Sequence, residues 1–331
     1  MTATTASPAA MSSHRLAWQR RRQTLVRNAR LFRRSRQAVV GLLILAVAVV
    51  VAIVAPWVVS PDAIDPATAT GVPNSPPSPG YPLGTDNFGR SVLSLLVMGT
   101  RVSLTVGIAA AVGAVVMGSA VGLVSGYYGG TRIDTFLNAV TNWFLVIPWL
   151  VLAIALASIL GATLWNVILV IAVTSWAITA RLVRSQVLSI RKLPYVERAR
   201  VLGASDWTII TRYVLPNVFP VIFANTVLTV AVAILSETTL AILGLGDPNS
   251  ISLGKLIESA FEEQATLRGE WWTIVPPGLL VTFLILGCTL YGQALEDTLN
   301  PRLKVSFLSP KSFRIRRGAA AEKQAVLEAG S

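Results

Sequence analysis

Residues 189–216 read SIRKLPYVERARVLGASDWTIITRYVLP, a polar stretch between two long apolar segments. Pro194 suits the first turn of a helix, which we expect to last about two turns. Gly203 then predicts a residue of positive φ that ends this helix. Ser205 or Asp206 can cap a second short helix, expected to reach Tyr213 before the next apolar segment. The stretch therefore predicts a compact helix–glycine–helix knob. The alternative is an ordinary membrane-surface loop.

The apolar segments on both sides of the knob are long enough to cross a bilayer, which takes about 20 helical residues. The sequence holds six such segments: 38–59, 102–125, 139–160, 164–182, 215–235 and 274–295. The composition, 53% hydrophobic and 13% charged, excludes an ordinary soluble protein. Open sheet edges in lipid leave backbone groups unpaired, and a closed barrel needs short alternating segments. We therefore predict an all-α, polytopic membrane protein with six transmembrane helices.

Lysine and arginine near the span ends predict the orientation, because they favour the cytoplasmic side. Nine arginines precede the first span, seven basic residues lie in 181–212, and seven follow residue 293. Segments 61–100 and 241–272 instead carry three and five acids against one and two basic residues. We therefore expect both termini and the knob in the cytoplasm. The arginine tail is interpreted as a topology signal and a contact with anionic lipid, not as a nucleic-acid site.

The expected organisation follows from these spans. It comprises a basic cytoplasmic tail (1–37), an anchor helix (38–59), an extracytoplasmic linker with a surface helix (60–100), a core of five spans (101–295) and a cytoplasmic tail (296–331). The first span is interpreted as a retained anchor, because its basic and apolar regions are too long for a cleaved signal peptide. Seven prolines between 61 and 82 predict a stiff, extended linker. Asp86 is placed to cap a short amphipathic helix on the outer membrane face.

Residues that carry chemistry are scarce in this sequence. One cysteine, Cys288, and one histidine, His14, exclude a disulfide framework, a Cys- or His-based metal cluster and a histidine-containing triad in the core. Gly254-Lys255 is followed by Leu256, and the sequence holds no P-loop. We therefore expect no catalytic residue, metal or cofactor, and no binding of ATP by the usual route.

Polar side chains in or beside apolar spans are costly, so they raise the question of a functional face. Asn138 and Asn142 stand one turn apart at the start of the third span, which Pro148 is expected to kink. Glu237 and Thr238 close the fifth span on its outer side. Each of these polar residues could instead only bind a neighbouring helix. Taken together, we expect them to mark a polar path.

The knob sequence resembles the EAA loop of permease subunits of binding-protein-dependent ABC importers. That family's pattern is Glu-Ala-Ala, three residues, Gly, nine residues, Ile, one residue and Leu-Pro. The positions that match are Glu197, Ala199, Gly203, Leu215 and Pro216. Arg198 stands where the family has its first Ala, and Tyr213 stands where it has Ile.

Further segments resemble the C-type permease of dipeptide and oligopeptide importers over roughly residues 38–304. They are Pro82-Leu83-Gly84-Thr85-Asp86 with Gly89-Arg90, Gly99-Thr100-Arg101-Val102-Ser103-Leu104, Gly126-Tyr127-Tyr128-Gly129-Gly130, Leu243-Gly244-Leu245-Gly246, Pro276-Pro277-Gly278 and Asn300-Pro301-Arg302-Leu303. The sequence departs from the family at Asn142, where Asp is usual. It also departs at 247–253, where a proline-rich stretch with Trp is usual.

The resemblance implies the type I importer permease fold in a bacterial inner membrane, and a set of partners. These are a second, homologous permease, two cytoplasmic ATP-binding subunits or domains that carry the ATPase activity, and an extracytoplasmic solute-binding protein. The coupling residues in the ATPase-facing knob would be Tyr195, Glu197, Arg198, Ala199, Arg200, Gly203, Ala204, Leu215 and Pro216. Docking of the binding protein is predicted on 241–272 together with 86–96, at Asp86, Arg90, Glu258, Glu262, Glu263 and Glu270.

The cargo is less well defined than the transport class. Peptides are the cargo that the resemblance favours, and nickel, haem or another small solute is the alternative within the family. An ion-driven secondary transporter usually shows internal repeats and ionisable residues inside its spans. A membrane scaffold would not need polar path residues. Uptake driven by ATP without an ion gradient would separate the first class from the other two.

Overall fold

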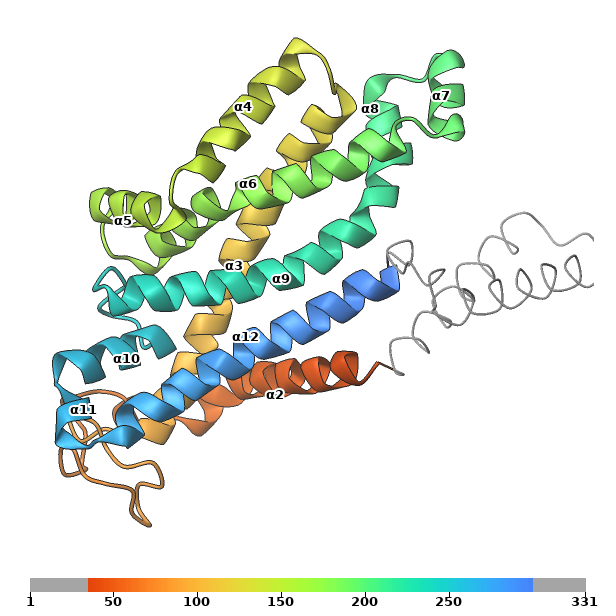
Figure 1. The fold of residues 1–331 in the computed structure, drawn as a ribbon. Coiled ribbons are helices and arrows are strands. Elements are labelled where there is room, and N and C mark those ends of the chain that lie inside the picture. The colour runs from red at the N-terminus through yellow and green to blue at the C-terminus, as the bar shows by residue number, and fades with distance from the viewer. Residues whose placement is uncertain (1–34, 300–331) are drawn as a thin grey trace, which may run out of the picture.

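The computed structural model describes residues 35–299, which form a set of long helices (Figure 1). The helices long and apolar enough to span a membrane are α2 (Arg36–Val58), α3 (Val92–Tyr127), α6 (Leu164–Ile190), α9 (Leu215–Ile242) and α12 (Trp271–Leu299). Between residues 35 and 299, pairing of extended segments is limited to isolated bridges. The predicted all-α membrane class is confirmed. The arginine tail and the Asn300–Leu303 match lie outside the described residues.

The predicted third span is broken. It consists of α4 (Arg132–Val146) and α5 (Trp149–Leu160), whose axes meet at 91°. Pro148 disfavours a helical conformation in the residue before it, and Ile147 is extended, with φ −69° and ψ 126°. The kink expected at Pro148 is therefore a right-angled break. The described residues contain five candidate spans, or six if this bent pair counts as one.

The second span begins earlier than predicted, because α3 runs unbroken for 36 residues from Val92. The separate surface helix expected before this span is therefore absent from the described residues, and its sequence enters the first turns of α3. Asp86 accepts hydrogen bonds from the N–H groups of Phe88 and Arg90, so it closes a turn instead of capping a helix. Ser91 is the N-cap residue of α3.

The proline-rich outer segment folds back on itself and includes the short 3₁₀-helix η1 (Pro61–Ala63). The Thr85 hydroxyl donates to the carbonyl of Val72 and accepts from the N–H of Ser75. The Trp272 indole of α12 donates to the Thr85 carbonyl at 3.2 Å, across 187 positions of sequence. The expected extended linker is therefore a compact cap that is fastened to the last helix.

Helices α3 and α6 pack closely because glycines line their contact. A Cβ on Gly118 would lie 2.5 Å from the carbonyl oxygen of Trp176, and one on Gly122 would lie 2.6 Å from that of Ala180. Such small-residue contacts let helix backbones approach each other in membranes. This pairing forms a rigid frame on which the functional elements stand.

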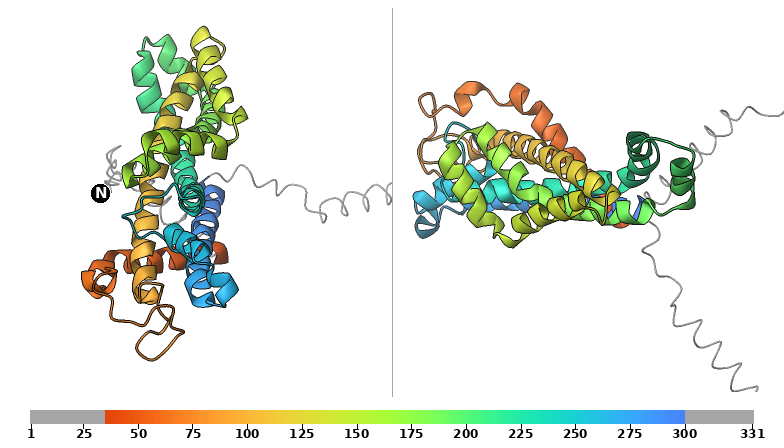
Figure 2. Two further views of the ribbon diagram at one scale, coloured as in Figure 1. Left: turned by 90° about the vertical axis from the view of Figure 1, so that its left-hand side faces the viewer. Right: turned by 90° about the horizontal axis from the view of Figure 1, so that it is seen from above.

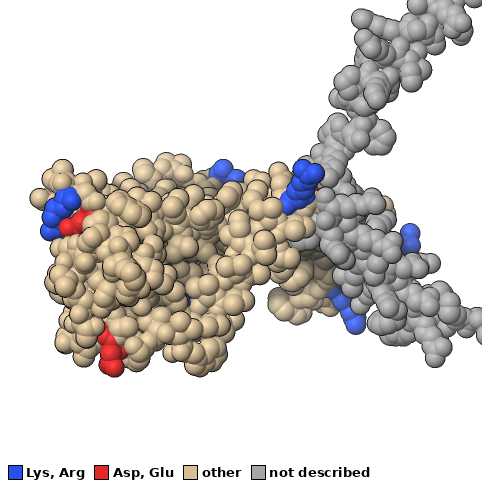
Figure 3. Space-filling view, turned by 90° about the horizontal axis from the view of Figure 1, so that it is seen from below, with Lys and Arg blue, Asp and Glu red and all other residues tan. Residues whose placement is uncertain are grey.

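The described part of the molecule is elongated, with two distinct ends (Figure 2). The knob of α7 (Pro194–Val201) and α8 (Asp206–Ile209) lies at one end. At the other end lie α10 (Leu253–Glu262), α11 (Ala265–Arg268) and the folded proline-rich segment, residues 61–90, which we call the outer cap after the side of the membrane predicted for it. The face drawn in Figure 3 is mostly uncharged between charged side chains towards its two ends, as expected for a protein that crosses a bilayer.

Candidate coupling site and transport path

The knob has the predicted helix–glycine–helix form. Gly203 has φ +82°, a conformation that L-residues with side chains rarely adopt, and it follows Leu202, the C-cap residue of α7. The N–H of Ala204 donates to the Ala199 carbonyl at 3.1 Å and closes the turn. Ser205 is the N-cap of α8, since its side chain accepts from the N–H of Thr208. Of the two cap candidates, the structure selects Ser205.

The second knob helix does not end at Tyr213, as the sequence suggested. It passes through a π-helical turn, η2 (Ile210–Val214), directly into α9. The N–H of Leu215 donates to the carbonyl of Ile210, five residues back. Pro216 lacks an N–H and cannot make the usual bond, which suits it to this first turn of α9. The result is one helix, Asp206–Ile242, that runs for 37 residues from the knob through the protein.

The knob has a buried core of its own. Val196, Ile209 and Val214 are fully buried and pack in one cluster with Val183 and Val187 of α6. Burial of these aliphatic side chains fixes the knob against the end of α6. The knob is therefore a packed unit joined to two long helices, not a loose loop.

The exposed surface of the knob is both charged and apolar. The predicted coupling residues Glu197, Arg198 and Arg200 are exposed, as is Pro216, while Tyr195 is 41% exposed. Ala199 is buried, and Ala204 and Leu215 are half-buried. Sequence reasoning missed three exposed apolar residues on the same knob: Val201 at 86%, Leu202 at 80% and Trp207 at 75%. The sequence did carry a sign of two of them, because Val201 and Leu202 form an apolar pair beside the turn glycine at the end of a mostly polar helix.

Two tyrosines at the end of α3 hold the knob through hydrogen bonds. We call the three residues involved, Tyr127, Tyr128 and Asp206, the tyrosine clamp. Both hydroxyls donate to the Asp206 carboxylate, Tyr127 to Oδ1 at 2.5 Å and Tyr128 to Oδ2 at 3.0 Å. Arg191, just after α6, donates to the Tyr127 carbonyl at 2.8 Å. The Arg200 guanidinium lies 5.7 Å from the centre of the Tyr127 ring. The start of the long helix is thus tied to the end of α3, which Arg191 in turn joins to the end of α6.

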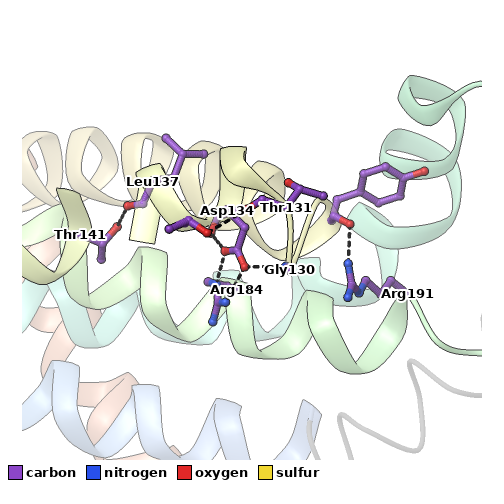
Figure 4. A network of polar contacts seen from close by, with 10 residues as sticks. Gly130, Thr131, Asp134, Leu137, Thr141, Arg184 and Arg191 are labelled. Carbon is purple, nitrogen blue, oxygen red and sulfur yellow. Dashed lines mark hydrogen bonds and ion pairs between the residues drawn. The ribbon is translucent and has the colours of Figure 1, made fainter. Parts of the chain in front are cut away.

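An ion pair between a buried carboxylate and a half-buried arginine secures the neighbouring corner of α3, α4 and α6 (Figure 4). Arg184 donates to both oxygens of Asp134, at 2.7 and 2.8 Å. The Ser125 hydroxyl and the Gly130 N–H complete the shell of this carboxylate, at 2.6 and 2.9 Å. Removing one partner of such a pair strands a buried charge and is strongly destabilising. Arg184 lies 50 positions from Asp134 in the sequence, so sequence reasoning did not connect the two residues.

The predicted path residues lie in two separate environments. Asn142 accepts a hydrogen bond from Arg181 of α6 at 2.9 Å, and Asn138 is half-buried on the same helix, α4. Glu237 and Thr238 are 4% and 5% exposed near the outer end of α9. Glu237 contacts Ser103 of α3, whereas Asn142 contacts α6, so these residues do not form one cluster. Their role in a path stays a prediction.

The predicted docking residues are largely engaged within the chain. Asp86 and Arg90 form an ion pair at 2.7 Å. Glu258 pairs with Lys255 at 2.5 Å, and Glu270 pairs with Arg268 at 2.9 Å, with both acids buried. Glu262 is exposed, whereas Glu263 is half-buried. Among the four outer acids, Glu262 is the one best placed for a partner.

Glu263 lies in the turn after α10 at the edge of a small pocket that Asp86 and Arg90 also line. Burial raises the pKa of this carboxyl to about 7, and the negative charge of Asp86 adds to the effect. Arg268 acts in the opposite direction, with a 3.8 Å separation from Glu263.

Known protein families and individual relatives match most of this chain in sequence. Residues 115–305 match the family described as binding-protein-dependent transport system inner membrane component, and residues 24–77 match the N-terminal transmembrane domain of oligopeptide transport permease C. A putative peptide transport system permease protein of Brucella suis biovar 1 is 36% identical over 286 residues, which is 85% of this chain and 93% of that protein.

Two further relatives show the range of names in the family. The dipeptide transport system permease protein of Alkalihalophilus pseudofirmus is 33% identical over 273 residues, 82% of this chain and 88% of that protein. The glutathione transport system permease protein of Pectobacterium atrosepticum is 33% identical over 232 residues, 70% of this chain and 76% of that protein. With the knob, the long helix and the spans in place, the chain belongs to the family of binding-protein-dependent transport system inner membrane components and is the permease subunit of an ABC importer.

Proposed function

We propose that this chain forms half of a translocation path for di- or oligopeptides, which a binding protein delivers from outside the cell. The relatives named for a cargo are peptide, dipeptide and glutathione permeases, and all three cargoes are peptides or peptide-like. A homologous second permease supplies the other half of the path. Asn138, Asn142, Glu237 and Thr238 are the candidates for contact with cargo during passage.

The ATPase partners dock on the knob. The observation that carries this assignment is the exposed apolar surface of Val201, Leu202 and Trp207 at the end of the 37-residue helix Asp206–Ile242. Large exposed apolar side chains outside the membrane mark a protein contact site. Glu197, Arg198 and Arg200 surround this surface and would fix the orientation of the partner. Closure of the ATPases pushes the knob, and the long helix carries that push across the membrane.

The orientation follows from the charges of the loops. The knob and both termini face the cytoplasm, and the outer cap with α10 and α11 faces the binding protein. Asp86, Arg90, Glu258, Glu262, Glu263 and Glu270 belong to this outer surface or support it from within. The protein resides in the inner or plasma membrane of a bacterium.

Uptake by proteoliposomes tests this function. The chain is co-purified with its partner permease and ATPases, reconstituted, and given binding protein outside and ATP on the knob side. We expect a radiolabelled dipeptide to accumulate with ATP and without any ion gradient. Accumulation that needs an ion gradient but no ATP would contradict the importer assignment. Uptake of nickel or haem in place of the dipeptide would contradict the peptide cargo alone.

A further inference from the structure

A buried carboxylate joins three helices near the outer end of the molecule. The Ser103 hydroxyl of α3 donates to Oε2 of Glu237 at 3.2 Å. The same Ser103 oxygen accepts the N–H of Leu253 at 3.1 Å. Leu253 is the first residue of α10, so a chain of hydrogen bonds runs from α9 through α3 to α10. We call this junction the Glu237 latch.

Two glycines let α10 approach the other helices closely enough for this contact. A Cβ on Gly254 would lie 2.8 Å from the Cα of Thr238 in α9. A Cβ on Gly99 would lie 3.3 Å from the backbone nitrogen of Leu253. Side chains at these positions would push α10 away from the carboxylate.

The start of α10 is a favourable partner for a negative charge. The first N–H groups of a helix have no partner inside the helix and carry a partial positive charge. Ser252, the N-cap residue of α10, also interacts with the Glu237 carboxylate. Burying an isolated carboxylate among apolar side chains costs free energy. The positive N-terminal end of α10 offsets part of that cost. If α10 moved away, water could solvate the carboxylate instead. The contact can therefore open and close without stranding a charge.

The latch and the tyrosine clamp involve the same helix. Asp206 begins the helix Asp206–Ile242 at the knob, and Glu237 lies close to its other end. The views in Figure 1 and Figure 2 place the knob and α10 at opposite ends of the described molecule. A displacement of the knob therefore has a continuous route to α10.

We propose that α10 is an outer gate of the transport path, and that Glu237 is the positioning residue that holds α10 against α9 and α3. This inference rests on the proposed transport function. It goes beyond that function by assigning the gate, the latch and the direction of coupling. Glu237 holds α10 closed in the resting state, and movement of α9 releases it.

The test measures the position of α10 directly in the reconstituted complex. Spin labels on Phe261→Cys in α10 and Leu93→Cys in α3 report their separation, since both positions are exposed, at 55% and 42%. The native Cys288 is 2% exposed and is shielded from labelling. The separation is compared between the nucleotide-free complex and the complex trapped with a non-hydrolysable ATP analogue.

Three variants are compared in this background. Glu237→Ala removes the carboxylate, and Ser103→Ala removes the bridge but keeps the carboxylate, which covers a failure of the first variant to assemble. Ser236→Ala is the matched control. It removes the hydroxyl of another 4% exposed residue beside Glu237, one whose hydrogen bond to the Val232 carbonyl stays within α9.

We expect the wild-type separation to change with nucleotide. Glu237→Ala and Ser103→Ala should raise the displaced α10 population in the nucleotide-free state by about tenfold, the scale of a lost hydrogen bond to a charged group. Ser236→Ala should follow the wild type. A wild-type separation unchanged by nucleotide, or latch variants that match the wild type, would overturn the proposal.

Dipeptide uptake is measured in the same vesicles. A complex that moves α10 but takes up no dipeptide would refute the cargo and leave the gate intact.

Discussion

The Tyr128 hydroxyl donates a 3.0 Å hydrogen bond to the carboxylate of Asp206, which follows it by 78 positions in the sequence. Tyr127 donates to the other oxygen of the same carboxylate. Two adjacent side chains at the end of α3 therefore hold the first residue of the long helix. Glu237 occupies a corresponding place at the outer end of that helix, so its two ends are fixed by polar contacts and its middle by apolar packing.

The tyrosine clamp predicts a transport defect without an assembly defect. Replacing Tyr127 and Tyr128 together by Phe removes both hydroxyls and keeps the rings. Because the knob core of Val196, Ile209 and Val214 remains, the complex should assemble normally. Dipeptide uptake per ATP hydrolysed should fall several-fold.

The control for the clamp is Tyr81→Phe, which removes an exposed tyrosine hydroxyl in the outer cap that contacts Thr70. It should leave the coupling ratio unchanged. A double Phe variant with the wild-type ratio would show that the clamp does not transmit the motion of the knob.

The knob glycine predicts a similar separation of folding from coupling. Gly203→Val meets no atom within 4 Å, so its effect arises from the φ of +82°, where a β-branched residue costs more than about 1–2 kcal/mol. The bend between α7 and α8 should change. Insertion and pairing with the second permease should persist, because the spans are held by other contacts, while uptake should be uncoupled from ATP hydrolysis.

Gly161→Val is the matched control for this glycine. Gly161 has φ +84° and also meets nothing within 4 Å, but it lies between α5 and α6, away from the knob. Both variants place a β-branched side chain at a positive φ. Equal loss of coupling in both would assign the effect to general destabilisation, and loss of expression with Gly203→Val alone would assign the turn to folding.

Most of the spans could be predicted from the sequence, because a long apolar segment in a bilayer pairs all of its backbone groups only as a helix. The helix–glycine–helix knob was also predictable, since Pro194, Gly203 and Ser205 act locally. The right angle at Pro148 was not, because proline predicts a break but the direction of the following helix depends on what α5 packs against. The long helix was hidden because a π-helical turn before Pro216 has no strong local signature.

The polar contacts were less predictable than the helices. Arg184 and Asp134 are 50 positions apart, and Ser103 and Glu237 are 134 positions apart, so no spacing rule connects them. The outer acids were predicted as a docking surface because a sequence does not show which charges are already paired. Glu258 and Glu270 turned out to be buried beside Lys255 and Arg268. The apolar surface of the knob was overlooked because its charges matched a known pattern.

Close packing of α3 on α6 predicts a stability defect at Gly118. In Gly118→Ala the new Cβ would lie 2.5 Å from the Trp176 carbonyl and 2.7 Å from the Thr179 Cβ, so the helices must separate. Overpacking of this kind costs about 1–3 kcal/mol, which should lower the thermal midpoint of the purified complex by several degrees. Gly278→Ala in α12 meets nothing within 4 Å and should leave the midpoint unchanged. Equal midpoints for both variants would show that this contact is adaptable.

The orientation is tested by cysteine labelling in intact cells. Gly80→Cys lies in the outer cap, where a Cβ meets nothing within 4 Å, and Thr131→Cys lies in the exposed turn between α3 and α4. A membrane-impermeant maleimide should label Gly80→Cys in intact cells and Thr131→Cys only after lysis. The native Cys288 is buried and gives the background. The reverse pattern would invert the topology deduced from the loop charges.

Glu263 predicts that the outer cap is more stable in mildly acidic solution than in alkaline solution. Its pKa is about 7 in the folded chain against an ordinary 4.5, so the folded state binds the proton more tightly than the unfolded state. The stabilisation from this group is fully present below pH 4.5 and is lost as the pH rises through 7. Asp86 and Glu270 raise this pKa further, whereas Arg90 and Arg268 lower it.

The thermal midpoint of the complex should therefore be higher at pH 5.5 than at pH 8, and Glu263→Gln should reduce that difference by removing the titrating group. Glu262→Gln is the matched control, because it neutralises the adjacent, exposed carboxyl and should keep the wild-type pH dependence. A Glu263→Gln complex whose midpoint still changes with pH as the wild type does would show that another group governs the cap. The same series at high salt separates burial from charge, because salt screens the contribution of Asp86 but leaves the desolvation of Glu263 unchanged.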